Sequence, residues 1–159
     1  MEGQIVNNFS YSGVMTVTLD GQVTSFKNRG TRELGIVITK ALAGYPIDNE
    51  VPRCFSIEEK DSDGSWINLL NRRLPFTGIT YDITETEEPC IGKLNLNCVI
   101  LSNDKKKDST DGKLRFCVYS MYGSNPLAIV ENTELNNIFN NITDGTDCVV
   151  RWKMCFYNK

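Results

Sequence analysis

The chain has 159 residues, of which 40% are hydrophobic and 23% charged, and this suffices for one domain with its own core, without disulfides or a metal. Acidic residues outnumber basic ones by 20 to 17, which argues against nucleic acid or an anionic membrane as a partner. The opening MEGQIVNNFSYSG lacks the basic and apolar regions of a signal peptide, and no segment approaches the ~20 apolar residues of a membrane helix, so we expect folding in the cytoplasm.

The first predicted elements are a hairpin and a helix. Residues 12–26 alternate in polarity around Asp20-Gly21, a dipeptide typical of a type I′ turn. The next segment changes to a helical period and is bounded by Thr31 as N-cap and by Gly44. Its predicted apolar stripe consists of Leu34, Val37, Ile38, Ala41 and Leu42.

The rest of the chain predicts short strands and one further helix. Strand-like segments are RCFSIEEK, LPFTGITYDI, KLNLNCVIL, KLRFCVYSMY and CVVRWKMCFY. In the last of these, Val150, Trp152, Met154 and Phe156 are expected on the buried face. A short helix is predicted over residues 134–140, capped by Asn132 or Thr133.

These elements indicate a mainly β fold. We expect an antiparallel β-sandwich of seven to nine strands, with one or two short helices packed on it. Residues 1–11 are predicted to form an N-terminal arm or an edge strand, and residues 12–159 the single sandwich domain.

Catalytic and metal-binding patterns are largely missing from the sequence. The chain has no histidine, which excludes Ser-His-Asp triads and HExxH zinc sites. Paired carboxylates remain as acid and base candidates, but each pair is explained as well by a solvated loop or turn: Glu58/Glu59, Asp61/Asp63, Glu85/Glu87/Glu88 and Asp144/Asp147. We therefore predict no enzymatic activity, no cofactor, no metal site and no small-molecule substrate.

Six cysteines and two polar loops have structural interpretations. Several cysteines lie in apolar segments and none forms a CxxC pair, so buried free thiols are expected. Asp61-Ser62-Asp63-Gly64 is interpreted as an Asx turn rather than a calcium loop. Lys105-Lys106-Lys107, flanked by Asp104 and Asp108, is predicted to be a solvated loop.

The order of several motifs resembles a group of small bacteriophage virion proteins of collars, tails and fibres. The motifs are the hairpin GVMTVTLDGQVTSF, the helix region KNRGTRELGIVITKALAG, the strand PRCFSIEE, the stretch WINLLNRRLPFTGITY and the ending GTDCVVRWKMCFYNK. This resemblance implies a non-enzymatic structural role in a virion, as a collar or tail ring component, a capsid decoration or a fibre-base protein. Its partners would be other virion proteins, including copies of itself.

The residues themselves allow two interpretations of the surface. The apolar N-terminal side chains Ile5, Val6, Phe9 and Tyr11 are candidates for contact with a neighbouring subunit. The alternative is a glycan- or receptor-binding β-sandwich, in which Trp66, Tyr119 or Tyr122 would stack on sugars beside Asp and Asn side chains. For these aromatic residues, packing in the core is a competing explanation.

Overall fold

The computed structural model describes residues 9–83, 90–110 and 112–158, which form ten strands, two α-helices and one 3-10 turn. The strands are β1 (Phe9–Leu19), β2 (Gln22–Gly30), β3 (Cys54–Lys60), β4 (Trp66–Asn68), β5 (Leu74–Pro75), β6 (Gly78–Ile83), β7 (Cys90–Ile100), β8 (Leu114–Tyr119), β9 (Ala128–Glu131) and β10 (Cys148–Asn158). The helices are α1 (Arg32–Leu42), α2 (Leu135–Asn140) and the 3-10 turn η1 (Ser102–Asp104).

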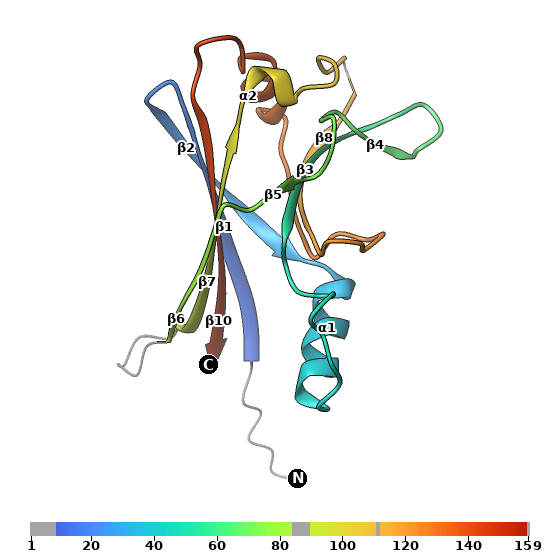
Figure 1. Cartoon of the computed structure of the whole chain (residues 1–159), viewed down its shortest axis with the longest axis vertical. Coiled ribbons are helices and arrows are strands. Elements are labelled where there is room, and N and C mark those ends of the chain that lie inside the picture. Colours follow the sequence, from blue (N-terminus) through green and yellow to red (C-terminus); the bar gives the residue numbers. More distant parts are fainter. Residues whose placement is uncertain (1–8, 84–89, 111, 159) are drawn as a thin grey trace.

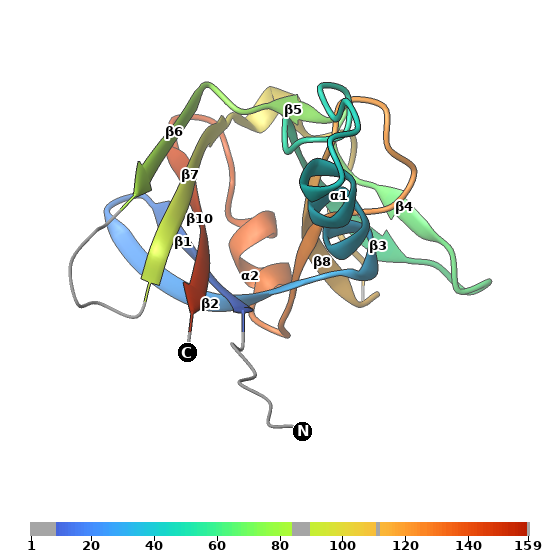
Figure 2. The same cartoon turned by 90° about the horizontal axis from the view of Figure 1, so that it is seen from below.

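All ten strands belong to one antiparallel sheet with the order β4-β3-β8-β9-β2-β1-β10-β7-β6, and β5 pairs with β3. The halves of this sheet are joined by only two residue pairs between β2 and β9, Arg29↔Ile129 and Gly30↔Ala128. At this narrow junction the sheet turns over, and the two halves cross and face each other (Figures 1 and 2). The mainly β, sandwich-like fold is as predicted. The number of strands exceeds the predicted maximum of nine because the ten include two very short ones, β4 with three residues and β5 with two.

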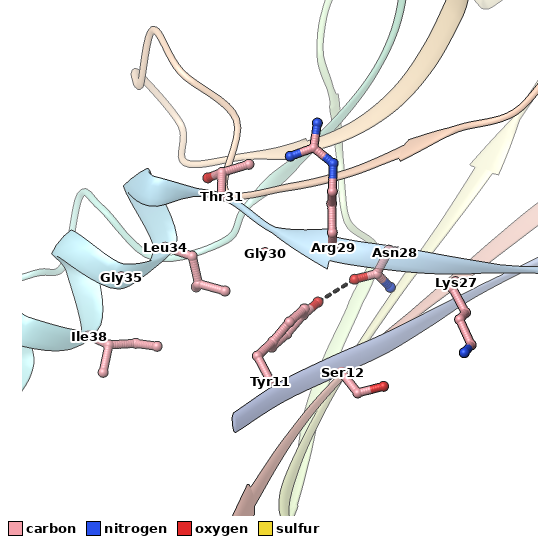
Figure 3. A pocket seen from close by; sticks show the side chains of 10 residues that line it. All are labelled: Tyr11, Ser12, Lys27, Asn28, Arg29, Gly30, Thr31, Leu34, Gly35 and Ile38. Carbon is pink, nitrogen blue, oxygen red and sulfur yellow. Dashed lines mark hydrogen bonds between the residues drawn. The ribbon is translucent and has the colours of Figure 1, made fainter. Parts of the chain in front are cut away.

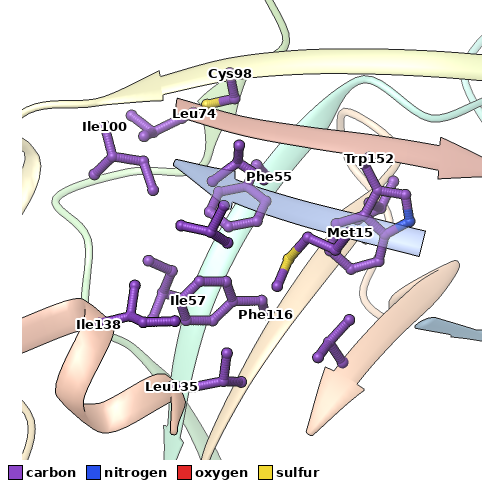
Figure 4. Packing of buried hydrophobic residues seen from close by; sticks show 14 of the residues in the cluster. Met15, Phe55, Ile57, Leu74, Cys98, Ile100, Phe116, Leu135, Ile138 and Trp152 are labelled. Atoms are coloured by element: carbon purple, nitrogen blue, oxygen red, sulfur yellow. The ribbon is translucent and has the colours of Figure 1, made fainter. Parts of the chain in front are cut away.

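Side chains from both halves fill the space between them (Figure 4). The ring of Phe55 on β3 meets that of Phe116 on β8 at a centroid distance of 5.5 Å and that of Trp152 on β10 at 6.4 Å. The alternation predicted for β10 is confirmed for Val150, Trp152 and Met154, which are buried. Phe156, one step further, is half-buried because it lies near the end of the strand.

The predicted hairpin is confirmed as β1 and β2. Asp20 and Gly21 have φ values of 51° and 82°, as a type I′ turn requires at both central positions. Met15 pairs with Phe26 on the core side. A strand that the sequence analysis did not predict, β9, is buried at Ala128, Ile129 and Val130.

Helix α1 begins and ends close to the predicted residues but packs over only part of its length. Thr31 is the N-cap residue, yet its hydroxyl makes no capping bond and instead donates to Pro126 O at 2.5 Å. Leu34 and Val37 are buried, whereas Leu42 is 84% exposed. The prediction of a continuous buried stripe is therefore wrong for the last turn, which extends beyond the sheet (Figure 1).

Helix α2 covers the opposite end of the core. Leu135, Ile138 and Phe139 are buried as predicted, and Asn132 Oδ1 accepts a hydrogen bond from Glu134 N at 2.9 Å. The prediction of a solvated Lys105 is wrong. Its ammonium group donates to Phe139 O and Ile142 O, both at 3.1 Å, and satisfies carbonyl groups at the end of this helix.

The chain enters the sheet three residues before the predicted start of the domain. β1 begins at Phe9, and Phe9, Ser10 and Tyr11 pair with Asn158, Tyr157 and Phe156 of β10. From Gly13 onward β1 also pairs with β2 and is an interior strand. Residues 9–11 of the predicted arm or edge strand therefore belong to the sheet, and residues 1–8 lie outside the described residues.

Candidate assembly surface

The sheet ends in two different edge strands, β4 and β6. β4 offers three residues, and its Trp66 ring is covered by the guanidinium of Arg115, 4.2 Å from the ring centroid. β6 offers six residues, Gly78–Ile83, of which all but the first are exposed. β6 is therefore the longer and more accessible of these two terminal strands. Among the described residues, Gln22–Asn28 of β2 also have no second partner strand, because β2 pairs with β9 only at Arg29 and Gly30.

Three large apolar side chains lie on one face of β6: Ile79, Tyr81 and Ile83. They are 40%, 76% and 70% exposed, respectively. Their partners across the strand pair are Leu96, Leu94 and Gly92 of β7. Leu96 is completely buried in the core, so the three side chains continue the core face of the sheet out to its edge, and we call them the apolar edge.

An exposed apolar edge is unusual, because an unpaired strand can bind another strand through its free backbone groups. Native proteins commonly protect such edges with lysine, proline or a bulge. β6 contains neither lysine nor proline, and its one charged residue, Asp82, lies opposite Lys93 of β7 on the other face. The apolar edge thus has the composition of a strand that is covered by a partner.

Of the four predicted contact residues, Tyr11 alone has a described side chain. Ile5 and Val6 lie outside the described residues, and Phe9 is placed in β1 by its backbone alone. The Tyr11 ring is half-buried and lies 5.5 Å from the ring of Phe156. Burial raises the pKa of its hydroxyl. Tyr11 is therefore primarily part of the fold.

The hydroxyl of Tyr11 is hydrogen-bonded to the amide of Asn28 (Figure 3). The orientation that satisfies the whole amide directs Asn28 Oδ1 to Val14 N at 2.9 Å and to Trp152 Nε1 at 3.1 Å. Asn28 pairs with Gly13, and a Cβ atom at Gly13 would overlap the Asn28 amide. This network joins β1, β2 and β10 at the end of the sheet where α1 lies.

Beside this network, a groove of about 550 Å³ lies between β1, β2 and α1. Leu34 and Ile38 of α1 line one wall and Tyr11 lines the other (Figure 3). Gly30 leaves room for the Leu34 side chain in this wall, since a Cβ atom there would lie 2.9 Å from Leu34 Cδ2. The groove contains Lys27 and Arg29 as its charged residues.

The candidate carboxylate pair Glu58/Glu59 is separated by the strand, because successive residues of β3 face opposite sides. Glu58 is buried on the outer face, where it accepts hydrogen bonds from Arg115 Nε at 2.8 Å and Tyr119 Oη at 2.6 Å. Glu59 lies on the core side and accepts from Thr110 N at 2.9 Å. Each carboxylate is thus occupied by structural bonds of its own.

The other carboxylates also have structural partners or fall outside the description. Asp61 Oδ1 accepts hydrogen bonds from Asp63 N and Ser65 N, both at 2.9 Å, which confirms the Asx turn. Asp144 Oδ1 accepts from Ser102 Oγ at 2.5 Å. The candidates Glu85, Glu87 and Glu88 lie outside the described residues. Across the described ranges, His, Cys, Asp and Glu side chains form no group of three that could bind a metal ion.

The three aromatic residues of the glycan-binding alternative differ in their accessibility. Tyr119 is buried, with the guanidinium carbon of Arg73 3.7 Å from its ring centroid. Trp66 is half-buried beneath Arg115. Tyr122 is 80% exposed and borders a pocket of about 250 Å³ together with Asn49, Ser124 and Asn125.

The five cysteines whose side chains are described are all buried. Four of them are free thiols, as predicted: Cys54, Cys98, Cys117 and Cys148. The side chain of Cys90 lies outside the description. Burial raises the pKa of the Cys98 and Cys148 thiols to about 12. These thiols are thus protonated at neutral pH and serve as core side chains.

Comparisons of the chain with family models, curated proteins and solved structures gave no match. Neither α1 nor α2, the α-helices of the described ranges, has the length and apolar character needed to cross a membrane.

Ile79, Tyr81 and Ile83 were not predicted as surface residues from the sequence. Their alternation with Thr80 and Asp82 predicts a strand, but only the strand order places that strand at an edge.

Proposed function

We propose that this protein is a non-enzymatic structural subunit of a bacteriophage virion that acts through protein–protein assembly. The observation that supports an assembly role is the apolar edge of β6, where three large side chains extend the core face of the sheet into solvent. Burial of such a surface by a partner is favourable, by about 25 cal/mol per Å² of apolar area. The assignment to a virion rests on the motif resemblance, and the subunit would be a collar or tail ring component, a capsid decoration or a fibre-base protein.

The experiment isolates phage particles from cells that produce this protein and quantifies the chain in them by mass spectrometry. The expected result is many copies per particle, retained after the particles are washed in high salt. A double variant, Tyr81→Lys with Ile83→Lys, should fold but fail to enter particles. Val23→Lys serves as the matched control, because Val23 is a 62% exposed apolar residue on β2. Particles that lack the wild-type chain would contradict the proposal.

A glycan-binding module is the second candidate, and it is favoured by the surroundings of Tyr122. This exposed ring borders a pocket with amide and hydroxyl groups from Asn49, Ser124 and Asn125, a combination that suits a sugar ring. A glycan array with the wild-type chain and a Tyr122→Ala variant tests it. Binding that disappears in the variant supports this function, and an array without signal argues against it.

A further inference from the structure

We infer that the partner of the apolar edge is a second copy of this chain, bound by antiparallel pairing of β6 with β6 about a two-fold axis. The inference rests on the proposed assembly role and specifies the first contact in it. In such a symmetric pair the same surface contributes on both sides, so it must be complementary to itself.

The sequence of β6 satisfies this condition in one register. When Tyr81 lies opposite Tyr81 of the second copy, Ile79 of each copy lies opposite Ile83 of the other. On the other face, Thr80 then lies opposite Asp82, whose carboxylate can accept a hydrogen bond from the threonine hydroxyl. All three apolar side chains thereby gain an apolar partner on the face that continues the core.

The neighbouring symmetric registers are less favourable. A pair centred on Asp82 places two carboxylates directly opposite each other, which is repulsive. A pair centred on Thr80 leaves Ile83 opposite Thr77 and therefore without an apolar partner. In the Tyr81 register, the two Asp82 side chains are offset along the strands, and each has Lys93 of its own β7 as cross-strand neighbour. Charge thus favours the same register as apolar contact.

Pairing of β6 with the other edge of a second copy would be a poorer match. β4 has three residues, Trp66–Asn68, of which Ile67 is an exposed apolar residue at 37%. Half of β6 would remain unpaired in such a head-to-tail contact. Between the two terminal strands, the self-pairing of β6 is the better match, and it gives a closed dimer instead of an open chain of subunits.

The size of the surface suits a modest affinity. Burial of the exposed parts of Ile79, Tyr81 and Ile83 removes on the order of 350 Å² per copy, against roughly 800 Å² per partner in a standard interface. Backbone pairing and neighbouring side chains such as Leu94 add to this area. We therefore expect a dimer that dissociates in the micromolar range.

Sedimentation equilibrium of the purified full-length chain over a micromolar concentration series measures the stoichiometry. The expected mass at high concentration is twice the 17.9 kDa of one chain. Tyr81→Lys should be monomeric throughout, whereas the Val23→Lys control should dimerise as the parent does. Thermal melts of all three chains verify that each is folded.

A cysteine at the symmetry axis tests the register directly. In a Cys90→Ser background, Tyr81→Cys should give a disulfide-linked dimer on mild oxidation, because Cα atoms of directly opposed residues lie about 4.5–5.5 Å apart and disulfides span about 4.4–6.8 Å. Val23→Cys, at a position that is also exposed, should remain monomeric on a non-reducing gel.

A wild-type chain that stays monomeric, a dimer that Tyr81→Lys leaves intact, or larger head-to-tail assemblies would each overturn the inference. The proposed function is tested by a different result, the presence of the chain in particles. A monomeric chain that is present in purified particles would refute the dimer and support the virion role. A dimeric chain that is absent from particles would support the dimer and refute the virion role.

Discussion

At the scale of single residues, Gly13 shows how one missing side chain determines the packing of β1 on β2. The Asn28 amide occupies the space that a Cβ atom at Gly13 would need. From there the amide reaches Val14 N and Trp152 Nε1. Glycine at position 13 therefore permits a buried polar network that links three strands.

Gly13→Ala should destabilise the protein by about 1–3 kcal/mol, because the added methyl group displaces a buried, hydrogen-bonded amide. Equilibrium unfolding in urea measures this loss. Gly35→Ala is the matched control, since a Cβ atom at this position of α1 contacts nothing within 4 Å. It should instead stabilise the chain by about 0.5–1 kcal/mol through helix propensity. Equal effects of the two substitutions would show that the Asn28 contact is unimportant.

The buried ion pair of Glu58 and Arg115 should behave as one unit. Arg115→Leu alone leaves a buried carboxylate and is expected to cost about 3–5 kcal/mol. The double variant with Glu58→Leu should recover a large part of that loss, because no unpaired charge remains. A double-mutant cycle from urea unfolding gives the coupling energy, and additive losses would contradict a direct interaction.

Stability should decrease at alkaline pH. The pKa values of Cys98 and Cys148 are raised from 9.0 to about 12 by burial, and burial also raises the pKa of Tyr119. Between these two values the folded state retains protons that the unfolded chain releases. The full free energy of unfolding is therefore present below pH 9, and it decreases as the pH rises towards 12. The free energy of unfolding should fall by about 1.4 kcal/mol per pH unit for each such group. Urea midpoints from pH 8 to 11 measure the slope, and a flat profile would refute the assigned burial.

At the scale of elements, local pattern and tertiary context contribute differently to each strand and helix. The type I′ dipeptide and the alternation of β10 predict their elements directly. Helix α1, in contrast, has an apolar stripe of three turns, but only its first part lies against the sheet. The periodicity of α1 predicts the helix correctly. It predicts only part of the buried face, because the length of the sheet beneath the helix does not depend on the local sequence.

Trp152→Ala should prevent stable folding. The side chain is 1% exposed and contacts Phe55 across the core, and removal of a buried aromatic side chain costs about 3–5 kcal/mol of the ~5–15 kcal/mol that stabilise a domain. Trp66→Ala removes the chain's other tryptophan from a half-buried position and should lower the melting temperature much less. Similar melting temperatures for both variants would show that the core position of Trp152 is incorrect.

At the scale of the whole molecule, two regions are proposed to contact neighbours: the apolar edge and the N-terminal segment. β1 begins at Phe9 and is held between β2 and β10 along most of its length. Ile5 and Val6 remain predicted contact residues. Phe9–Tyr11, which the sequence assigned to the arm or edge strand, therefore belong to the sheet.

Two deletions distinguish residues that stabilise the sheet from residues that are predicted to dock on a partner. Removal of residues 1–8 should leave the melting temperature close to that of the parent, since β1 and the Tyr11–Asn28 bond are retained. Removal of residues 1–11 should lower it substantially, because three pairs with β10 and the buried Tyr11 hydroxyl are lost. If residues 1–8 form a docking arm, the shorter deletion also abolishes incorporation into particles, and unchanged incorporation would exclude the arm as an anchor.

Features that depend on neighbours along the chain can be predicted from the residues: the β1–β2 hairpin, the buried face of β10, both α-helices, the Asx turn at Asp61 and the burial of cysteines in apolar segments. These features arise from side-chain periodicity and turn geometry. Other features become visible only in the folded chain: which strands lie at the edges, that Glu58 and Glu59 face opposite environments, and that Lys105 meets the end of α2. Such features depend on strand order and on contacts between distant segments. The alternation in GITYDI fixes a strand with an apolar face, but the fold leaves that face without a cover.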